Sequence, residues 1–245
     1  GNKTVNLALT LSAASGKDIV LNYSIDAAST ATGITDYSDP NSGEITLSAG
    51  STSFNLPISV VKDDLTESDE TIIVDLDSAD NANIVTTPTH THTITNDDVS
   101  PYVLNVTSNT ANATYGSGVT VDVRVVFSKA IVVDTTGGTP SIALETGDTD
   151  QDASYSSLAT TTIANDTAVF TFTSDNDDET ADLAYKATTS LALNLGTIKD
   201  SAGNDAVLTL PNLGAAGSLN ANKAIVFSCG LTISTTSTIA NGMQG

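Results

Sequence analysis

The sequence is poor in aromatic residues and in positive charge. It contains no Trp, one Cys and one Met, and aromatic residues make up 4% of its 245 residues. That shortage argues against the apolar pocket in which a buried organic cofactor sits. Eight Lys and Arg residues stand against 29 Asp and Glu residues, which gives a net charge of -21. No basic stripe is present to neutralise phosphates, so we exclude nucleic acid as a partner.

Long apolar runs and cysteine pairs are also missing. No run approaches the roughly 20 apolar residues that cross a bilayer, and residues 1–20 lack the basic and then apolar order of a signal peptide. We therefore expect a soluble chain without membrane insertion, and a fragment of a larger protein. Cys229 is the single cysteine, which excludes an internal disulfide. Stability must then come from sheet packing, with bound ions as a possible further contribution.

What the sequence does contain is a succession of short runs rich in Val, Ile, Thr and Leu, separated by turn residues. This pattern is typical of a β-sandwich. It stops at "NDDVSP" and restarts after Pro101, which suits a domain boundary. The prediction is all-β, with two tandem antiparallel β-sandwich (Ig-like) domains at 1–98 and 99–229. Residues 230–245 are either a tail or the start of a further module.

Helix is nearly absent from this prediction. Gly, Asn, Asp and Thr interrupt every stretch that is long enough to hold a helical period. The nearest candidate follows Asp178, where one or two helical turns precede a strand predicted at 191–198.

Five carboxylates crowd the loop between the predicted strands at 52–61 and 71–78. They are Asp63, Asp64, Glu67, Asp69 and Glu70, and only Lys62 offers an opposite charge nearby. Two unit charges about 4 Å apart repel by roughly 1 kcal/mol in water and about 4 kcal/mol at an effective dielectric near 20. Ca²⁺ relieves such repulsion with 6 to 8 oxygen ligands in flexible geometry. The alternative is a solvated acidic loop that keeps the surface soluble.

The wider segment "TGITDYSDPNSGEITLSAGSTSFNLPISVVKDDLTESDETIIVDL", followed by "HTITNDD", resembles the Calx-beta domain. This is the sandwich module of sodium/calcium exchangers, which also recurs in very large bacterial surface proteins. The resemblance covers about residues 1–98. It includes the Asp36–Tyr37 step, the strand 43–46, the acidic loop and a terminal Asp pair.

The resemblance implies a set of calcium ligands at one end of the sandwich. The residues at the matching positions are Asp36, Asp63, Asp64, Glu67, Glu70, Asp97 and Asp98. Lys62 and Asn96 replace two of the family's acids. The glutamate that the family's first strand usually contributes would precede Gly1, so we expect the sequence to begin inside the domain. We therefore expect fewer or weaker Ca²⁺ sites than in the exchanger.

Residues 100–229 resemble a bacterial immunoglobulin-like repeat of large surface adhesins. The resemblance rests on "VTVDVRVVFSKAIVV", "GTPSIALETG", "TAVFTFTSDNDDETADLAY" and "LALNLGTIKDSAGNDAVLTLP". Further acids gather at 148–152, at 175–179, and at Asp200 and Asp205. Each is either a second Ca²⁺ loop or a solvated turn. "DSAGN" favours the turn, because Asp and Asn bond their own backbone there and Gly supplies positive φ.

The sequence predicts no enzyme. It has no Gly-x-Ser-x-Gly elbow, and its two histidines, His90 and His92, share one strand, where they alternate with Thr. Together these features predict a secreted or cell-surface adhesin fragment, acting as a calcium-stabilised spacer or adhesion module. The alternatives are a spacer that needs no metal and a module whose second-domain loops bind a glycan or protein.

The predicted partners are neighbouring modules of the same protein and a ligand on a host, prey or biofilm surface. Lysine to asparagine isopeptide crosslinks, at Lys129, Lys186 or Lys223, remain open on the sequence alone.

Overall fold

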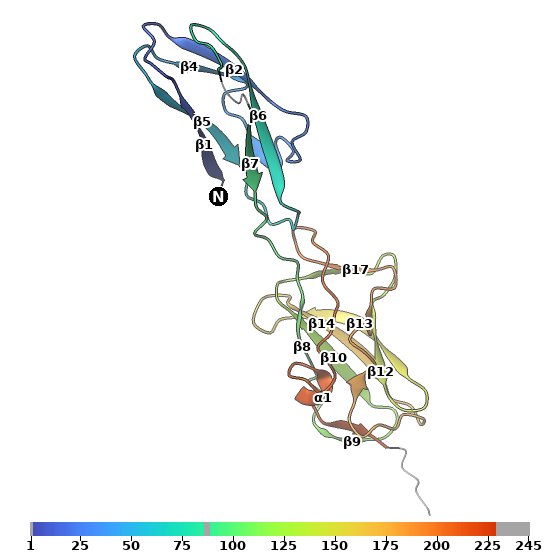
Figure 1. The fold of residues 1–245 in the computed structure, drawn as a ribbon. Coiled ribbons are helices and arrows are strands. Elements are labelled where there is room, and N and C mark those ends of the chain that lie inside the picture. The colour runs from blue at the N-terminus through green and yellow to red at the C-terminus, as the bar shows by residue number, and fades with distance from the viewer. Residues whose placement is uncertain (1, 86–88, 229–245) are drawn as a thin grey trace, which may run out of the picture. The chain divides into compact units, whose positions relative to one another are not determined.

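The structure is a computed structural model that describes residues 2–85 and 89–228. It divides into two compact units, Gly1–Val99 (unit 1) and Ser100–Gly245 (unit 2), each with its own apolar core. Figure 1 shows that strands make up both units, which confirms the predicted all-β fold of tandem sandwiches. Cys229 and the segment 230–245 lie outside the described residues.

Unit 1 is built from two antiparallel sheets that enclose one core. The first has the order β1-β5-β3, and the second has the order β4-β2-β6-β7. The strands of the first sheet are β1 (Lys3–Thr10), β5 (Ser53–Val60) and β3 (Tyr37–Ser38). Those of the second are β4 (Glu44–Leu47), β2 (Ile19–Ile25), β6 (Glu70–Ala79) and β7 (Thr89–Ile94).

Alternation along the strands explains why these sheets face each other. Leu56 and Ile58 of β5 are 0% and 2% exposed, and Ile72 and Val74 of β6 are 1% and 2% exposed. Successive side chains of a strand point to opposite faces, so every second residue enters the core. The loop 61–69, which carries the acidic residues, connects β5 to β6 and therefore lies at one end of this sandwich.

Strand pairing brings two other segments to the same end. Glu70 at the start of β6 pairs with Ile94 at the end of β7, so the residues that follow β7 leave beside the start of β6. Tyr37 of β3 pairs with Val60 at the end of β5, so Asp36 lies next to the point where the acidic loop begins. Three loops far apart in the sequence thus converge.

Unit 2 centres on one large antiparallel sheet of the order β15-β12-β13-β14-β10-β8, with β16 also pairing to β12. Its strands are β8 (Val103–Thr107), β10 (Thr120–Phe127), β12 (Ser141–Glu145), β13 (Gln151–Ala159), β14 (Thr167–Thr173), β15 (Ala184–Tyr185) and β16 (Leu191–Ala192). Two smaller pairs complete the unit. They are β11 (Val132–Asp134) with β17 (Thr197–Lys199), and β18 (Ile225–Phe227) with β9 (Ala113–Tyr115).

The helical turns predicted after Asp178 are wrong. The backbone N–H of Leu183 donates to Ile225 O, and that of Lys186 donates to Ala143 O. These N–H groups therefore bond other strands and are not available for i to i−4 bonds. The one helix in the described residues, α1 (Leu219–Asn222), has four residues. No helix there has the length and apolar character needed to span a bilayer.

The strand predicted at 191–198 is broken into β16 and β17. Asn194 and Leu195 between them have φ values of 50° and 71°. The backbone there runs against Gly138, where an added Cβ would lie 1.7 Å from Asn194 O. Only glycine tolerates so close an approach, so the turn depends on Gly138.

Candidate metal centre

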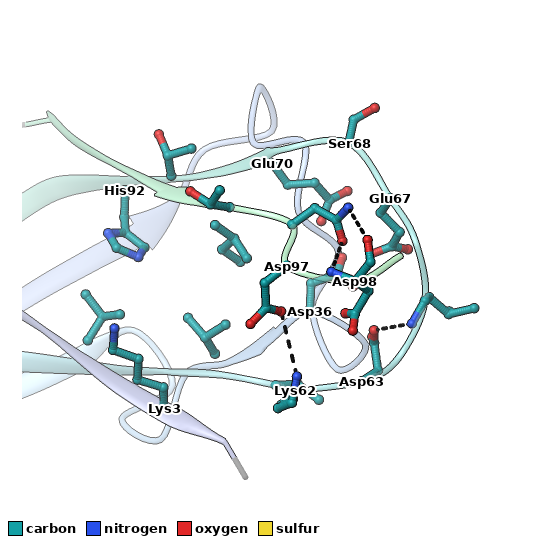
Figure 2. Close-up of a pocket in the computed structure, with 18 residues that line it drawn as sticks. Lys3, Asp36, Lys62, Asp63, Glu67, Ser68, Glu70, His92, Asp97 and Asp98 are labelled. Atoms are coloured by element: carbon teal, nitrogen blue, oxygen red, sulfur yellow. Dashed lines mark hydrogen bonds and ion pairs between the residues drawn. The ribbon is translucent and has the colours of Figure 1, made fainter. Parts of the chain in front are cut away.

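The three converging loops of unit 1 surround a cavity of about 400 Å³. Figure 2 shows its lining, with the acids gathered at one end, His92 and Lys3 toward the other, and Lys62 along one side. The charged residues that line it are Lys3, Asp36, Lys62, Asp63, Glu67, Glu70, Asp97 and Asp98. Six of these eight are carboxylates, so the cavity is strongly negative.

Asp36, Glu67 and Glu70 form the centre of the acidic end. One carboxylate oxygen from each lies within 4.8 Å of the others. Asp36 is buried at 8% exposure, Glu70 is half-buried and Glu67 is exposed. In the described residues 2–85 and 89–228, this is the only such group of three His, Cys, Asp or Glu residues.

Backbone contacts fix Asp36 in this position. Its N–H donates to Thr32 O at 3.0 Å, and its carbonyl accepts from the Val61 N–H at 2.8 Å. Its Oδ2 also accepts a hydrogen bond from the Thr32 N–H. The bond from the Val61 N–H ties Asp36 directly to the start of the acidic loop, so the Asp36 carboxylate is held beside Glu67 and Glu70.

Mutual repulsion shows in the acidities of the two glutamates. Burial first, and then the charges of Asp36, Asp63 and Asp98, raise the pKa of Glu67 above its ordinary value. Burial, the charge of Asp36 and a hydrogen bond to Asp36 raise the pKa of Glu70, and Glu67 and Asp63 add to this. Among the described residues, no Lys, Arg or His forms an ion pair with Asp36, Glu67 or Glu70. The cluster therefore retains uncompensated negative charge.

The other four predicted ligands are not part of this group, although three of them line the same cavity. Asp63 lines the cavity, and its Oδ1 accepts from the Leu65 N–H at 3.0 Å. The Asp98 N–H donates to Asn96 Oδ1 at 3.2 Å. Asp97 lies 3.7 Å from Lys62 Nζ. Asp64 is not part of the cavity lining. Of the seven residues predicted from the resemblance, the structure thus brings three together.

Asp69, the fifth acid of the loop, has a structural contact. Its Oδ1 accepts a hydrogen bond from the Asn96 N–H at 3.0 Å. It therefore links the acidic loop to the segment that follows β7, which keeps those two loops together.

The cluster fits a hard divalent cation such as Ca²⁺. Calcium binds carboxylate oxygens at about 2.3 to 2.6 Å, so two oxygens on one ion lie at most about 5 Å apart. The oxygens of Asp36, Glu67 and Glu70 meet this limit at 4.8 Å. Oxygen donors alone, without Cys, favour Ca²⁺ or Mg²⁺ over the transition metals that prefer nitrogen and sulfur.

In unit 2, several acids bond their own loops. Asp200 Oδ1 accepts from the N–H groups of Ala202, Gly203 and Asn204, each at 3.0 Å. Burial on its own would raise the pKa of Asp200, but hydrogen bonds from Asn204, Ala202 and Gly203 lower it overall. The "DSAGN" segment is therefore a hydrogen-bonded turn, which favours a turn over a Ca²⁺ loop, but Asp200 and Asn204 in it are buried rather than solvated.

The histidines, and two of the lysines considered for isopeptide crosslinks, have identifiable surroundings in the structure. His92 lines the unit 1 cavity, and burial, His90 and Lys3 lower its pKa. Lys129 Nζ lies 3.9 Å from Asp200 Oδ2, and Lys186 forms an ion pair with Asp150. Isopeptide crosslinking at these lysines stays a prediction.

Residues 1–99 match the family model of the Calx-beta domain. This match confirms the resemblance noted for residues 1–98, whereas the resemblance of residues 100–229 to an adhesin repeat stays a prediction. A search of curated proteins gives no match.

Two solved structures resemble the chain at low identity. One is CBD12 from CALX1.2, with 13% identity over 76% of each chain and a TM-score of 0.35. The other is the calcium binding domain CBD12 of CALX1.1, with 13% identity over 69% of each chain and a TM-score of 0.37. The assignment of the Calx-beta domain therefore rests on the family model.

Proposed function

We propose that unit 1 binds Ca²⁺ at Asp36, Glu67 and Glu70, and that the chain is a non-catalytic, calcium-stabilised spacer or adhesion module. The observation that carries this proposal is the convergence of three carboxylates, from two loops and a strand start, without a paired cation. The match of residues 1–99 to the Calx-beta domain supports it. Asp63 and Asp98, which line the same cavity, provide further oxygen atoms around the centre.

The role of the ion in this proposal is mechanical. Asp36 precedes β3, Glu67 belongs to the loop between β5 and β6, and Glu70 begins β6, so one ion would join both sheets of the sandwich. Binding would remove the charge repulsion that, after burial, raises the pKa of both glutamates. A ligand that binds only the folded state at 100 times its Kd adds about 2.7 kcal/mol to the free energy of unfolding.

The wider setting that we propose is a large bacterial extracellular protein at the cell surface or in secreted form. Unit 2 has its own apolar core, and its turns at Asp166 and Asp200 are hydrogen-bonded within themselves. Such a module is useful as a spacer that projects a binding domain from a cell. A net charge of -21 would keep neighbouring molecules apart.

The experiment is a calorimetric titration of Ca²⁺ into metal-stripped protein, paired with melting curves in Ca²⁺ and in chelator. We expect saturable binding and a raised melting temperature, both lost in Glu70→Gln. The matched control is Asp80→Asn, which removes one exposed carboxylate outside the cavity and should bind as the wild type does. Absence of binding heat and of any melting shift in the wild type would overturn the proposal.

The ion pair between Lys62 and Asp97 favours a second candidate, a spacer that needs no metal. In that case Lys62 would already balance part of the acidic loop, and the rest would stay solvated. This candidate predicts that Ca²⁺ does not change the melting temperature of the wild type, and that it does not change the melting temperature of Glu70→Gln either.

A further inference from the structure

Lys62 is the one lysine of the acidic loop 61–69, and it lies at the cavity that contains the proposed ion site. Its side chain lines the cavity together with Asp36, Glu67 and Glu70. Its Nζ lies 3.7 Å from Asp97 Oδ1, and Figure 2 shows this contact on one side of the acidic end. Its backbone N–H is held by Asn2 Oδ1 at 3.3 Å.

Asp97 is paired with Lys62 and does not belong to the group of three carboxylates. Asp36, Glu67 and Glu70 have oxygens within 4.8 Å of one another, and Asp97 is outside that group. The Asp97 side chain is 83% exposed and that of Lys62 is 48% exposed, so water screens the pair. Exposed pairs of this kind contribute about 0 to 1 kcal/mol, so the pair with Lys62 can lower the contribution of Asp97 to calcium affinity by up to about fivefold.

We propose that Lys62 is a built-in counter-ion that sets the calcium affinity of this site. It acts in two ways: its charge repels the incoming ion, and its ion pair withholds Asp97 as a ligand. The proposal predicts that neutralising Lys62 tightens calcium binding. It also predicts that the loss of Asp97 weakens binding more when Lys62 is absent. This inference rests on the proposed function, because it concerns the affinity of the same centre.

The effect of the charge is testable by neutralising it. In water, a unit charge at one Debye length from a divalent ion, about 8 Å at physiological ionic strength, changes the affinity by about fivefold, and added salt reduces this effect. We expect Lys62→Gln to bind Ca²⁺ about fivefold more tightly than the wild type at low salt. The gain should shrink at 0.5 M salt. Lys62→Glu should bind more tightly still, because it adds a carboxylate.

Two matched variants separate this effect from general charge. Lys62→Arg keeps the positive charge and should bind as the wild type does. Lys17→Gln removes one positive charge from an exposed position outside the cavity, and it should change affinity by less than twofold. A structural role of Lys62 would instead lower the melting temperature of Lys62→Gln in chelator without tightening binding.

The withholding of Asp97 is testable by a double-mutant cycle. Asp97→Asn should weaken binding by less than twofold in the wild type, because Lys62 already engages that carboxylate. In the Lys62→Gln background the same substitution should weaken binding several-fold, because Asp97 is then released to the ion. Equal effects in the two backgrounds would contradict this part of the inference.

The experiment is calorimetric titration of the full chain with CaCl₂, for the wild type and for each variant. One outcome would overturn the role of Lys62 and leave the calcium site in place. In it, the wild type binds Ca²⁺, Glu70→Gln does not, and Lys62→Gln binds no more tightly than Lys17→Gln. No binding by the wild type, Lys62→Gln or Lys62→Glu would overturn both proposals together.

Discussion

Two acidic loops, one in each unit, differ in which groups contact their carboxylates. In unit 1, Asp36, Glu67 and Glu70 lie within 4.8 Å of one another, and burial and neighbouring charge raise the pKa of both glutamates. In unit 2, Asp166 is 1% exposed and accepts hydrogen bonds from the N–H groups of Thr161, Thr162 and Ile163. Burial works to raise its pKa, but these bonds and those from side-chain hydroxyls lower it strongly.

This contrast teaches that a high density of acids in a sequence does not by itself specify an ion site. What decides is whether N–H donors lie within reach of each carboxylate. Where donors converge, as on Asp166 and Asp200, the negative charge stabilises a turn. Where carboxylates converge instead, burial and their mutual repulsion raise their pKa, and this favours binding of a proton or of a cation.

The largest expected effect is the loss of stability of unit 2 when Asp166, the hydrogen-bonded carboxylate, is removed. Asp166→Ala leaves three part-buried N–H groups and the buried hydroxyl of Thr167 without this acceptor, and an unsatisfied buried donor costs about 1 to 3 kcal/mol. We expect the free energy of unfolding of unit 2 to fall by about 4 kcal/mol, with calcium binding unchanged. Denaturant unfolding and calorimetry measure the two quantities. The control is Asp148→Ala, an exposed loop residue, and a loss as large in that variant would refute the role assigned to Asp166.

The next effect is calcium stabilisation restricted to unit 1. At 100 times the Kd we expect about 2.7 kcal/mol, which corresponds to roughly 10 °C or more in Tm for a domain of about 100 residues. Hydrogen exchange should slow in β5 (Ser53–Val60) and stay unchanged in β10 (Thr120–Phe127). If Ca²⁺ slowed hydrogen exchange equally in both strands, the claim that it stabilises only unit 1 would be wrong.

A third effect is the opposite pH dependence of the two kinds of site. The raised pKa of Glu67 and Glu70 means that unit 1 binds more protons folded than unfolded just above their ordinary value of 4.5. Their contribution to stability in chelator therefore falls as pH rises through that range, and Ca²⁺ should offset the loss. Asp166, whose pKa is lowered, contributes stability above its ordinary value of 3.8, and loses it as pH falls further.

Unfolding free energies of four variants between pH 2 and pH 8, all in chelator, test this pH dependence. Glu70→Gln should gain stability relative to the wild type as pH rises above 4.5, the ordinary pKa of a glutamate, because the pKa of Glu70 is raised by burial and by Asp36. The difference between wild type and Asp166→Asn should favour the wild type at neutral pH and shrink below pH 3.8. Glu44→Gln and Asp148→Asn are the exposed controls and should show neither trend.

The smallest effect is the gain from removing one repelling charge when calcium is absent. In chelator, Glu70→Gln should raise the melting temperature of unit 1 by a few degrees, since exposed or half-buried charges contribute up to about 1 kcal/mol. In saturating Ca²⁺ the order should reverse, because the variant cannot be stabilised by the ion. A variant less stable than the wild type under both conditions would show that Glu70 supports the fold in another way.

Much of the fold was predictable from the sequence because period-two alternation is a local signal. The runs around Leu56, Ile72 and Val123 alternate between buried and half-exposed residues, and each became a strand. β13 was missed, because the acids at 148–152 were read as a loop although Gln151 and Asp152 begin this strand. The expected strand at 191–198 failed because its break depends on Gly138, more than 50 residues earlier.

The candidate site was predictable only as a set of acids. The sequence and the family resemblance named Asp36, Glu67 and Glu70 together with Asp63, Asp64, Asp97 and Asp98, and could not rank them. The ranking depends on the backbone bond from Val61 to Asp36, on the pairing of Glu70 with Ile94, and on the contact of Lys62 with Asp97. All three join residues that are distant in the sequence.

The sequence by itself therefore determined the all-β architecture, the acidic character of the β5 to β6 loop and the Calx-beta match of residues 1–99. These follow from residue type and local period, which need no tertiary contact to be read. Only the tertiary structure decided which carboxylates meet one another, which meet N–H donors and which one meets Lys62. The reason is physical: electrostatic energy depends on distance through space, and strand pairing sets that distance without regard to separation along the chain.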